Sequence, residues 1–164
     1  KRAGSWHSPV DMHKRAEFAD LLGRIRATAY DVFNANGYDP AWEVEIDTMW
    51  ANINPPGGYN RAHVHPHSLW SGVYWIHAPE DAGRIIFQDP IMARQMAPPA
   101  YDPDKEVQAS QWSTVHFEPI AGRLVLFPSW LNHEVELNRS ALDGEAAERI
   151  SVSFNIRQFK PKEG

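Results

Sequence analysis

The sequence predicts an all-β core preceded by one N-terminal helix, and three observations lead to this prediction. About eight short segments between residues 42 and 159 are rich in β-branched and aromatic residues. Turn-forming stretches such as PPGG, PEDAG and IAG separate them. Helical spacing of apolar residues occurs before this region and not between its segments. Short strands without intervening helices favour an antiparallel jelly roll or barrel over alternating strands and helices.

The helix is expected over about residues 12–36, with Gly37 placed to end it. Its apolar residues recur at helical spacing: Phe18, Leu21, Leu22, Ile25, Ala29, Val32 and Phe33. An amphipathic helix of this kind covers one face of a sheet, so we expect no chemistry from it.

The barrel is expected over about residues 42–159, which makes the whole chain, 1–164, a single domain. Its strand candidates are WEVEIDTMWANIN, RAHVH, SGVYWIHA, RIIFQD, STVHFEP, RLVLFP, HEVELN and RISVSFNIRQF. Residues 90–112 interrupt them with a long, proline-rich stretch, and loops of that length often gate or line a site. A disordered surface loop is the alternative. Met92, Met96 and Tyr101 favour a lid that packs against a surface.

Composition excludes several functions. Lys and Arg number 16 against 21 Asp and Glu, without a basic stripe, so nucleic acid is not an expected partner. No apolar run reaches the roughly 18 to 20 residues of a membrane helix, and the first residues lack the apolar stretch of a signal peptide, so no membrane partner is expected. The chain has no cysteine, which excludes disulfides and thiolate chemistry and fits a cytoplasmic location.

Three histidines occupy alternate positions in the stretch RAHVHPHSLW: His63, His65 and His67. Alternate residues of a strand point to one face, so either neighbouring pair can converge on one point. His133, at the start of a later strand candidate, is the best third ligand. Its neighbour Glu134 is a poor one, because adjacent residues of a strand face opposite ways. The pattern therefore predicts a metal site built from histidines.

Together with its other motifs, this sequence resembles the double-stranded β-helix oxygenases. These enzymes have a jelly-roll, cupin-like fold and use Fe(II) and 2-oxoglutarate. The resemblance is closest to a bacterial and phage branch with the signatures HxHP, SGVYY, DP and FPSWLxH. The matching stretches lie within about residues 50–156: HVHP at 63–66, SGVYW at 71–75, FQDP at 87–90, LVLFPSWLNHEV at 124–135 and RISVSFNI at 149–156.

The resemblance implies roles for individual residues. The metal-binding pair of the family matches His63 and His65, and its distal histidine matches His133. The RxS element, which binds the far carboxylate of 2-oxoglutarate, corresponds to Arg149 and Ser151. The chemistry agrees, because an arginine forks onto a carboxylate with two hydrogen bonds and a serine hydroxyl can add another. A surface ion pair is the alternative role for Arg149.

The sequence departs from the family pattern at one ligand. Most of the superfamily has HxD or HxE, which gives two histidines and one carboxylate. Here the corresponding residue is histidine whether the motif begins at His63 or at His65, so a three-histidine site would carry one more unit of positive charge. Asp89, in FQDP, is the nearest candidate carboxylate. Which two of His63, His65 and His67 bind the metal is left open.

Three further residues, Asn52, Tyr74 and Asn155, are candidate contacts for substrate or cosubstrate. For the asparagines, hydrogen bonds to backbone groups at strand ends are the alternative. The remaining histidines are expected to have surface or ordinary hydrogen-bonding roles: His7, His13, His77 and His116.

The expected function is that of a dioxygenase which uses Fe(II), 2-oxoglutarate and molecular oxygen to hydroxylate a small molecule or a peptide. Two alternatives differ in class. One is a cupin-type three-histidine dioxygenase that needs no 2-oxoglutarate. The other is a barrel without enzymatic activity that binds a small ligand or a protein and is stabilised by a structural metal ion.

Overall fold

A computed structural model describes residues 4–161 of the chain. Its helices are α1 (Ala19–Ala35) and the short α2 (Met92–Met96). Its strands are β1 (Trp6–His7), β2 (Glu43–Asn54), β3 (Asn60–His63), β4 (Trp70–His77), β5 (Ile85–Gln88), β6 (Thr114–Phe117), β7 (Leu124–Pro128), β8 (His133–Val135) and β9 (Arg149–Phe159). None of the described helices is long and apolar enough to cross a membrane.

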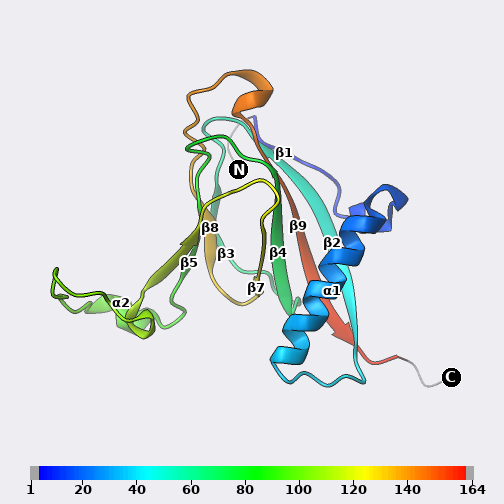
Figure 1. Cartoon of the computed structure of the whole chain (residues 1–164), viewed down its shortest axis with the longest axis horizontal. Coiled ribbons are helices and arrows are strands. Elements are labelled where there is room, and N and C mark those ends of the chain that lie inside the picture. The colour runs from blue at the N-terminus through cyan, green and yellow to red at the C-terminus, as the bar shows by residue number, and fades with distance from the viewer. Residues whose placement is uncertain (1–3, 162–164) are drawn as a thin grey trace.

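The strands form two antiparallel sheets, which confirms the predicted β-rich core. One sheet has the order β1-β2-β9-β4-β7 and the other the order β3-β8-β5-β6. The two-residue strand β1 is an addition to the expected set, and it pairs with the end of β2. Figure 1 shows β2, β9 and β4 side by side, with β3, β8 and β5 in a second layer.

Helix α1 covers the outer face of the five-stranded sheet, as the sequence predicts (Figure 1). Ile25, Ala29 and Phe33 are buried on the helix and pack in one cluster with sheet residues such as Met49 and Phe154. The helix starts later than expected, because residues 12–18 form two short 3-10 turns separated by an extended Arg15.

A β-bulge in β2 decides which side chains face the inside of the barrel. The register with β9 shifts between Ile46 and Thr48. The buried outer-face residues are therefore Ile46 and then Met49, instead of an unbroken alternation. After the bulge, Trp50, Asn52 and Asn54 fall on the opposite face and line a cavity between the sheets. The bulge thus turns a polar stretch inward.

The inner face of this sheet is polar at one end and apolar further along. Asn52 lies opposite Ser151, and Asn54 lies opposite Arg149. A separate apolar cluster joins the two sheets and consists of Val73, Trp75, Ile85, Phe87 and Phe127. A polar inner surface beside an apolar cluster is the arrangement of a binding cavity rather than of a closed core.

Residues 90–112 form an arm that projects away from the strands in Figure 1. Three residues of this arm were expected to pack against a surface. Met96 is 85% exposed and Tyr101 is 45% exposed, and the side chain of Met92 lies outside the described part of the structure. The base of the arm borders an apolar groove of about 510 Å³ between β6 and β7, lined in part by Trp70 and Trp112. In this conformation the arm does not cover the cavity beside Asn52, since none of its residues lines that cavity.

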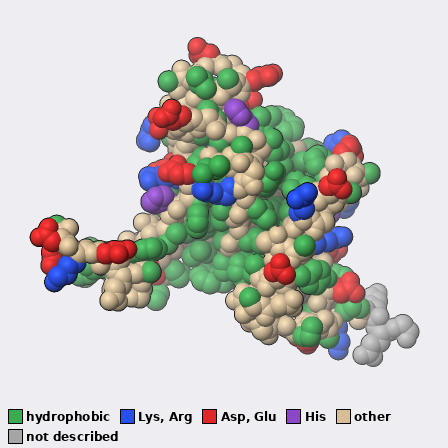
Figure 2. All heavy atoms as spheres, in the orientation of Figure 1, with side chains coloured by type: hydrophobic (Ala, Val, Ile, Leu, Met, Phe, Trp, Pro, Cys, Tyr) green, Lys and Arg blue, Asp and Glu red, His purple; other side chains and the backbone are tan. Residues whose placement is uncertain are grey.

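Charged side chains are dispersed over the surface. Figure 2 shows acidic and basic groups interspersed on the visible face, without a basic stripe.

Candidate metal centre

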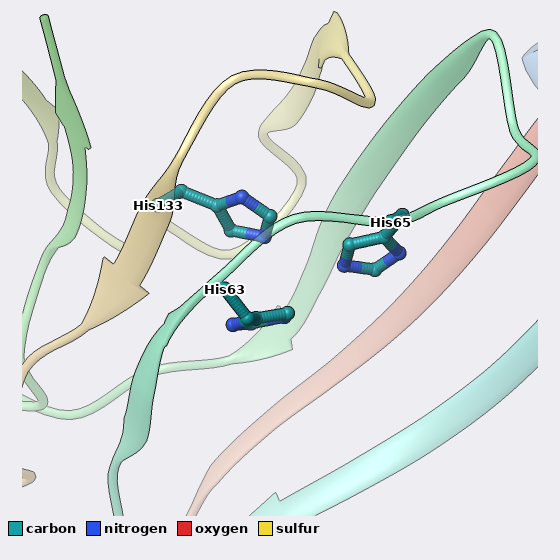
Figure 3. Close-up of side chains that lie close together, drawn as sticks. All are labelled: His63, His65 and His133. Carbon is teal, nitrogen blue, oxygen red and sulfur yellow. The ribbon is translucent and has the colours of Figure 1, made fainter. Parts of the chain in front are cut away.

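Three histidines converge in the structure, from β3, from the loop that follows it and from β8. His63 ends β3 and lies opposite His133, which begins β8. His65 follows in the loop after β3, where its backbone N–H donates to the carbonyl of Ser129 at 2.9 Å. Each ring offers one nitrogen to a common point, and these atoms lie within 4.8 Å of one another. Figure 3 shows the three rings pointing toward one another.

Within the part of the chain that the structure describes, these are the residues grouped closely enough to hold a metal ion. His67 is outside the group and adopts a left-handed backbone conformation, with φ 69°, in the turn that follows. Asp89 is also outside it, because its carboxylate binds Arg94 at 3.1 Å and accepts the backbone N–H of Ile91. The residues that lie together are therefore His63, His65 and His133.

Hydrogen bonds fix the protonation pattern of the three rings. The Nδ1 atoms lie 2.7 Å from the carbonyl of Arg61 for His63, 2.7 Å from Oδ1 of Asn155 for His65, and 2.9 Å from the carbonyl of Leu131 for His133. Carbonyl oxygens only accept hydrogen bonds, so each Nδ1 carries the proton. In a neutral ring this arrangement leaves Nε2 with a lone pair, which is the form that binds a metal ion.

Burial keeps two of these rings neutral. The pKa of His133 is lowered from 6.5 to about 4, mainly because burial disfavours the charged ring. Burial likewise lowers the pKa of His65, although the hydrogen bond to Asn155 opposes the shift. Nε2 of His65 is buried and has no hydrogen-bond partner among the described residues. A buried nitrogen with a lone pair and no donor costs free energy unless a ligand such as a metal ion occupies it.

A hydrogen-bond network behind His65 holds its ring in place. Oδ1 of Asn155 also accepts from Oγ of Ser71 at 2.8 Å, while Nδ2 of Asn155 donates to Oγ1 of Thr48 at 2.9 Å. Ser71 in turn is 2.7 Å from the hydroxyl of Ser129. The structure therefore places Asn155 behind the ring of His65 and outside the lining of the cavity.

Arg149 lies on the same inner wall and is 1% exposed, so it is not part of a surface ion pair. Its Nη1 donates to the backbone carbonyls of Ala82, Gly83 and Glu136. Its Nη2 is buried and has no hydrogen-bond partner in the described structure. Burial lowers the pKa of Arg149 to about 10, which leaves it charged at neutral pH. The carboxylate of Glu136 is held by Arg84, at 2.8 and 3.0 Å.

The histidines and Arg149 line one cavity of about 270 Å³. Ser151 and Asn52, expected from the sequence, line it as well. Tyr74 does not: its neighbours Val73 and Trp75 line the cavity, and alternation along β4 directs Tyr74 to the opposite face. Tyr74 therefore does not line this cavity.

Sequence reasoning missed several further residues of this cavity, among them Trp50, Ser153 and His7. Trp50 stacks on His65, with ring centroids 6.0 Å apart, and His7 stacks on Trp50 at 5.6 Å. Trp50 and Ser153 could have been found by alternation from Asn52 and Ser151. His7, which was expected to have an ordinary surface role, reaches the cavity through the pairing of β1 with β2, for which the sequence has no signal.

The two sheets and the histidine cluster between them define a double-stranded β-helix protein with a candidate metal centre. Residues 48–155 match a family described as "Putative 2OG-Fe(II) oxygenase". The chain belongs to this family of oxidoreductases. The matched region contains the three clustered histidines, Arg149 and Ser151.

Solved structures agree with the fold. A prolyl-4-hydroxylase from Pseudomonas putida has a TM-score of 0.60 at 18% identity, over 94% of this chain and 69% of that one. The α-ketoglutarate-dependent epimerase SnoN from nogalamycin biosynthesis has a TM-score of 0.61 at 14% identity, over 92% and 59%. A viral collagen prolyl hydroxylase from Paramecium bursaria Chlorella virus-1, solved with 2OG, has a TM-score of 0.54 at 13% identity, over 93% and 79%.

These identities establish similarity of fold and not of substrate. The chain also spans less than half, 45%, of a 2OG-Fe(II) oxygenase family oxidoreductase from Burkholderia pseudomallei. No curated protein sequence matches the chain significantly.

Proposed function

We propose that this chain is an Fe(II)- and 2-oxoglutarate-dependent dioxygenase that hydroxylates its substrate. In this proposal His63, His65 and His133 bind the iron, and Arg149 and Ser151 bind the far carboxylate of 2-oxoglutarate. Iron and 2-oxoglutarate together supply the activation of molecular oxygen and the oxidising power for attack on a C–H bond.

One observation carries the proposal: two buried groups on one cavity wall lack partners, and they have complementary ligands. Nε2 of His65 needs a Lewis acid, and Nη2 of Arg149 needs an anion. Both residues line the same cavity, which has room for a small dicarboxylate. A metal ion and a carboxylate would satisfy both groups at once.

The residues of the chain have distinct tasks in this proposal. Hydrogen bonds orient all three rings before the metal arrives, and burial keeps those of His65 and His133 neutral, so binding requires little reorganisation. Ser151, 6% exposed and opposite Asn52 on the paired strand, adds a hydroxyl beside Arg149. Trp75 and Phe127 form apolar parts of the wall and keep water from the bound groups.

Two other functions account for less of the structure. A cupin-type three-histidine dioxygenase explains the metal ligands, but it leaves the buried charge of Arg149 without an anion. A structural metal site would need a closed ligand set. Here three histidines stand beside an open cavity, and no carboxylate in the described part of the chain completes the set.

The test is succinate formation. Protein loaded with Fe(II) without oxygen should convert 2-oxoglutarate to succinate slowly when oxygen is admitted, even without substrate. Matched samples lacking iron or oxygen, and the variant His133→Ala, should form none. Succinate production that is equal in His133→Ala and the parent would contradict the proposal. Oxygen consumption without any need for 2-oxoglutarate would support the cupin-type alternative.

A further inference from the structure

The cavity that contains the histidine cluster is electropositive, although the whole chain has a formal net charge of −5. Two arginines line it, Arg149 on the buried wall and Arg61 at the exposed rim. None of its lining residues is Asp or Glu. A cavity lined by one sign of charge with partly apolar walls concentrates ligands of the opposite sign.

The ligand set increases this imbalance, an argument that rests on the proposed function. The charge of a ferrous ion is balanced by the two carboxylates of 2-oxoglutarate. Three neutral histidines add no negative charge, whereas the usual set of two histidines and one carboxylate adds one. The loaded site, in which 2-oxoglutarate pairs with both the iron and Arg149, therefore keeps one net positive charge, and Arg61 adds a second. An anionic substrate would offset both.

Arg61 is positioned to bind such a group. Its backbone carbonyl accepts the hydrogen bond from Nδ1 of His63 at 2.7 Å, which ties its backbone to a proposed metal ligand. Its side chain is exposed and lines the same cavity. No carboxylate among the described residues lies within 4.0 Å of its guanidinium. Arg61 also borders a second pocket, on the outer side of β3, together with Glu134 and Glu136. Glu136 is held there by Arg84 at 2.8 Å.

We propose that the substrate carries an anionic group, a carboxylate or a phosphate, that Arg61 binds at the rim of the cavity. Arginine is suited to this task because its planar guanidinium forks onto either group. Anchoring at the rim would leave the rest of the substrate to reach the histidines, past the stacked rings of Trp50 and His7. Arg61 would then select substrates by their charge, whereas the three histidines would bind the metal and would not contribute to this selection.

The test titrates acetate, acetamide and inorganic phosphate into the metal-free protein and follows the Nε–Hε NMR signal of Arg61. Acetate and acetamide have similar shapes and differ in charge. We expect a saturable shift with acetate or phosphate and none with acetamide. The anion that binds with the higher affinity indicates whether the anionic group of the substrate is a carboxylate or a phosphate. Arg61→Gln, which lacks this signal and is followed at the backbone N–H signals of residues 61 and 63, should weaken anion binding about tenfold, the scale of a charge-assisted hydrogen bond. Arg26→Gln, on the exposed face of α1, should have no effect.

Equal shifts with acetate and acetamide would overturn the proposal. So would anion binding that is unchanged in Arg61→Gln, because the anions would then bind elsewhere, for instance at Arg149. Arg61→Gln should keep the affinity of the parent for iron and for 2-oxoglutarate. Failure of the proposed function would be seen separately, as a parent protein that does not bind 2-oxoglutarate, while the anion titration still reports on Arg61.

Discussion

Replacing Arg149 with lysine should weaken 2-oxoglutarate binding and leave iron binding unchanged. Arg149 divides its hydrogen bonds between two tasks, because Nη1 donates to three backbone carbonyls and Nη2 remains for a ligand. Lysine keeps the positive charge on a single nitrogen. That nitrogen would be drawn to the three carbonyls and could not also reach a carboxylate in the cavity.

The expected magnitude follows from the lost interaction. A hydrogen bond to a charged group contributes about 1.5 to 3 kcal/mol, and each 1.4 kcal/mol is a factor of ten in affinity. The Kd for 2-oxoglutarate should therefore rise by about 10-fold to 150-fold in Arg149→Lys. Arg149→Ala should be weaker still, but it also leaves buried carbonyls unsatisfied and so confuses binding with stability.

The assay is calorimetric titration of 2-oxoglutarate into iron-loaded protein without oxygen. Arg157→Lys is the matched control, because Arg157 lies on the same strand but is exposed and paired with Glu45 at 2.7 Å. It should bind 2-oxoglutarate as the parent does. Equal Kd values for the parent and Arg149→Lys would refute the assignment of Arg149 as the carboxylate ligand.

Four further predictions concern the ligands, the network, pH and the arm. His133→Ala should lose most of its iron affinity, measured by competition with a chelator, whereas His116→Ala, exposed on β6, should keep it. Asn155→Leu should lower iron affinity by about 10-fold to 100-fold, because His65 loses its acceptor, and Asn155→Asp should retain it; equal affinities would remove Asn155 from this role. The metal-free protein should become less stable to urea as pH falls from about 6.5 to about 4, since the unfolded chain takes up a proton that buried His133 resists; His133→Asn should flatten this dependence. Protease should cut first near Tyr101, and slower cutting with iron and 2-oxoglutarate would identify the arm as a lid, whereas an unchanged rate would exclude one.

The architecture was predictable where local periodicity decides it. The helical spacing of Ile25, Ala29 and Phe33 predicted the helix and its buried face correctly. The bulge between Ile46 and Thr48 was not predictable, because an extra residue in a strand depends on how the partner strand pairs. The same holds for the two residues of β1, whose sequence is too short to show an alternation.

The candidate site divides in the same way. His63 and His65 are near in sequence, and the motif around His133 predicted its place at the start of a strand, as observed. The hydrogen bonds of Asn155 to Ser71 and Thr48 were not predictable, because these partners come from β4 and β2 and only the assembled sheet brings them together. The electropositive cavity is also a property of the fold, since the overall composition is acidic.

The most direct test of the account is the optical spectrum of the iron-loaded protein during addition of 2-oxoglutarate without oxygen. A 2-oxoglutarate molecule bound through its keto acid end to ferrous iron gives a visible charge-transfer band. The account predicts a band that saturates at one 2-oxoglutarate per iron and is absent from His133→Ala. Iron bound by the parent without any band on adding 2-oxoglutarate would contradict the account.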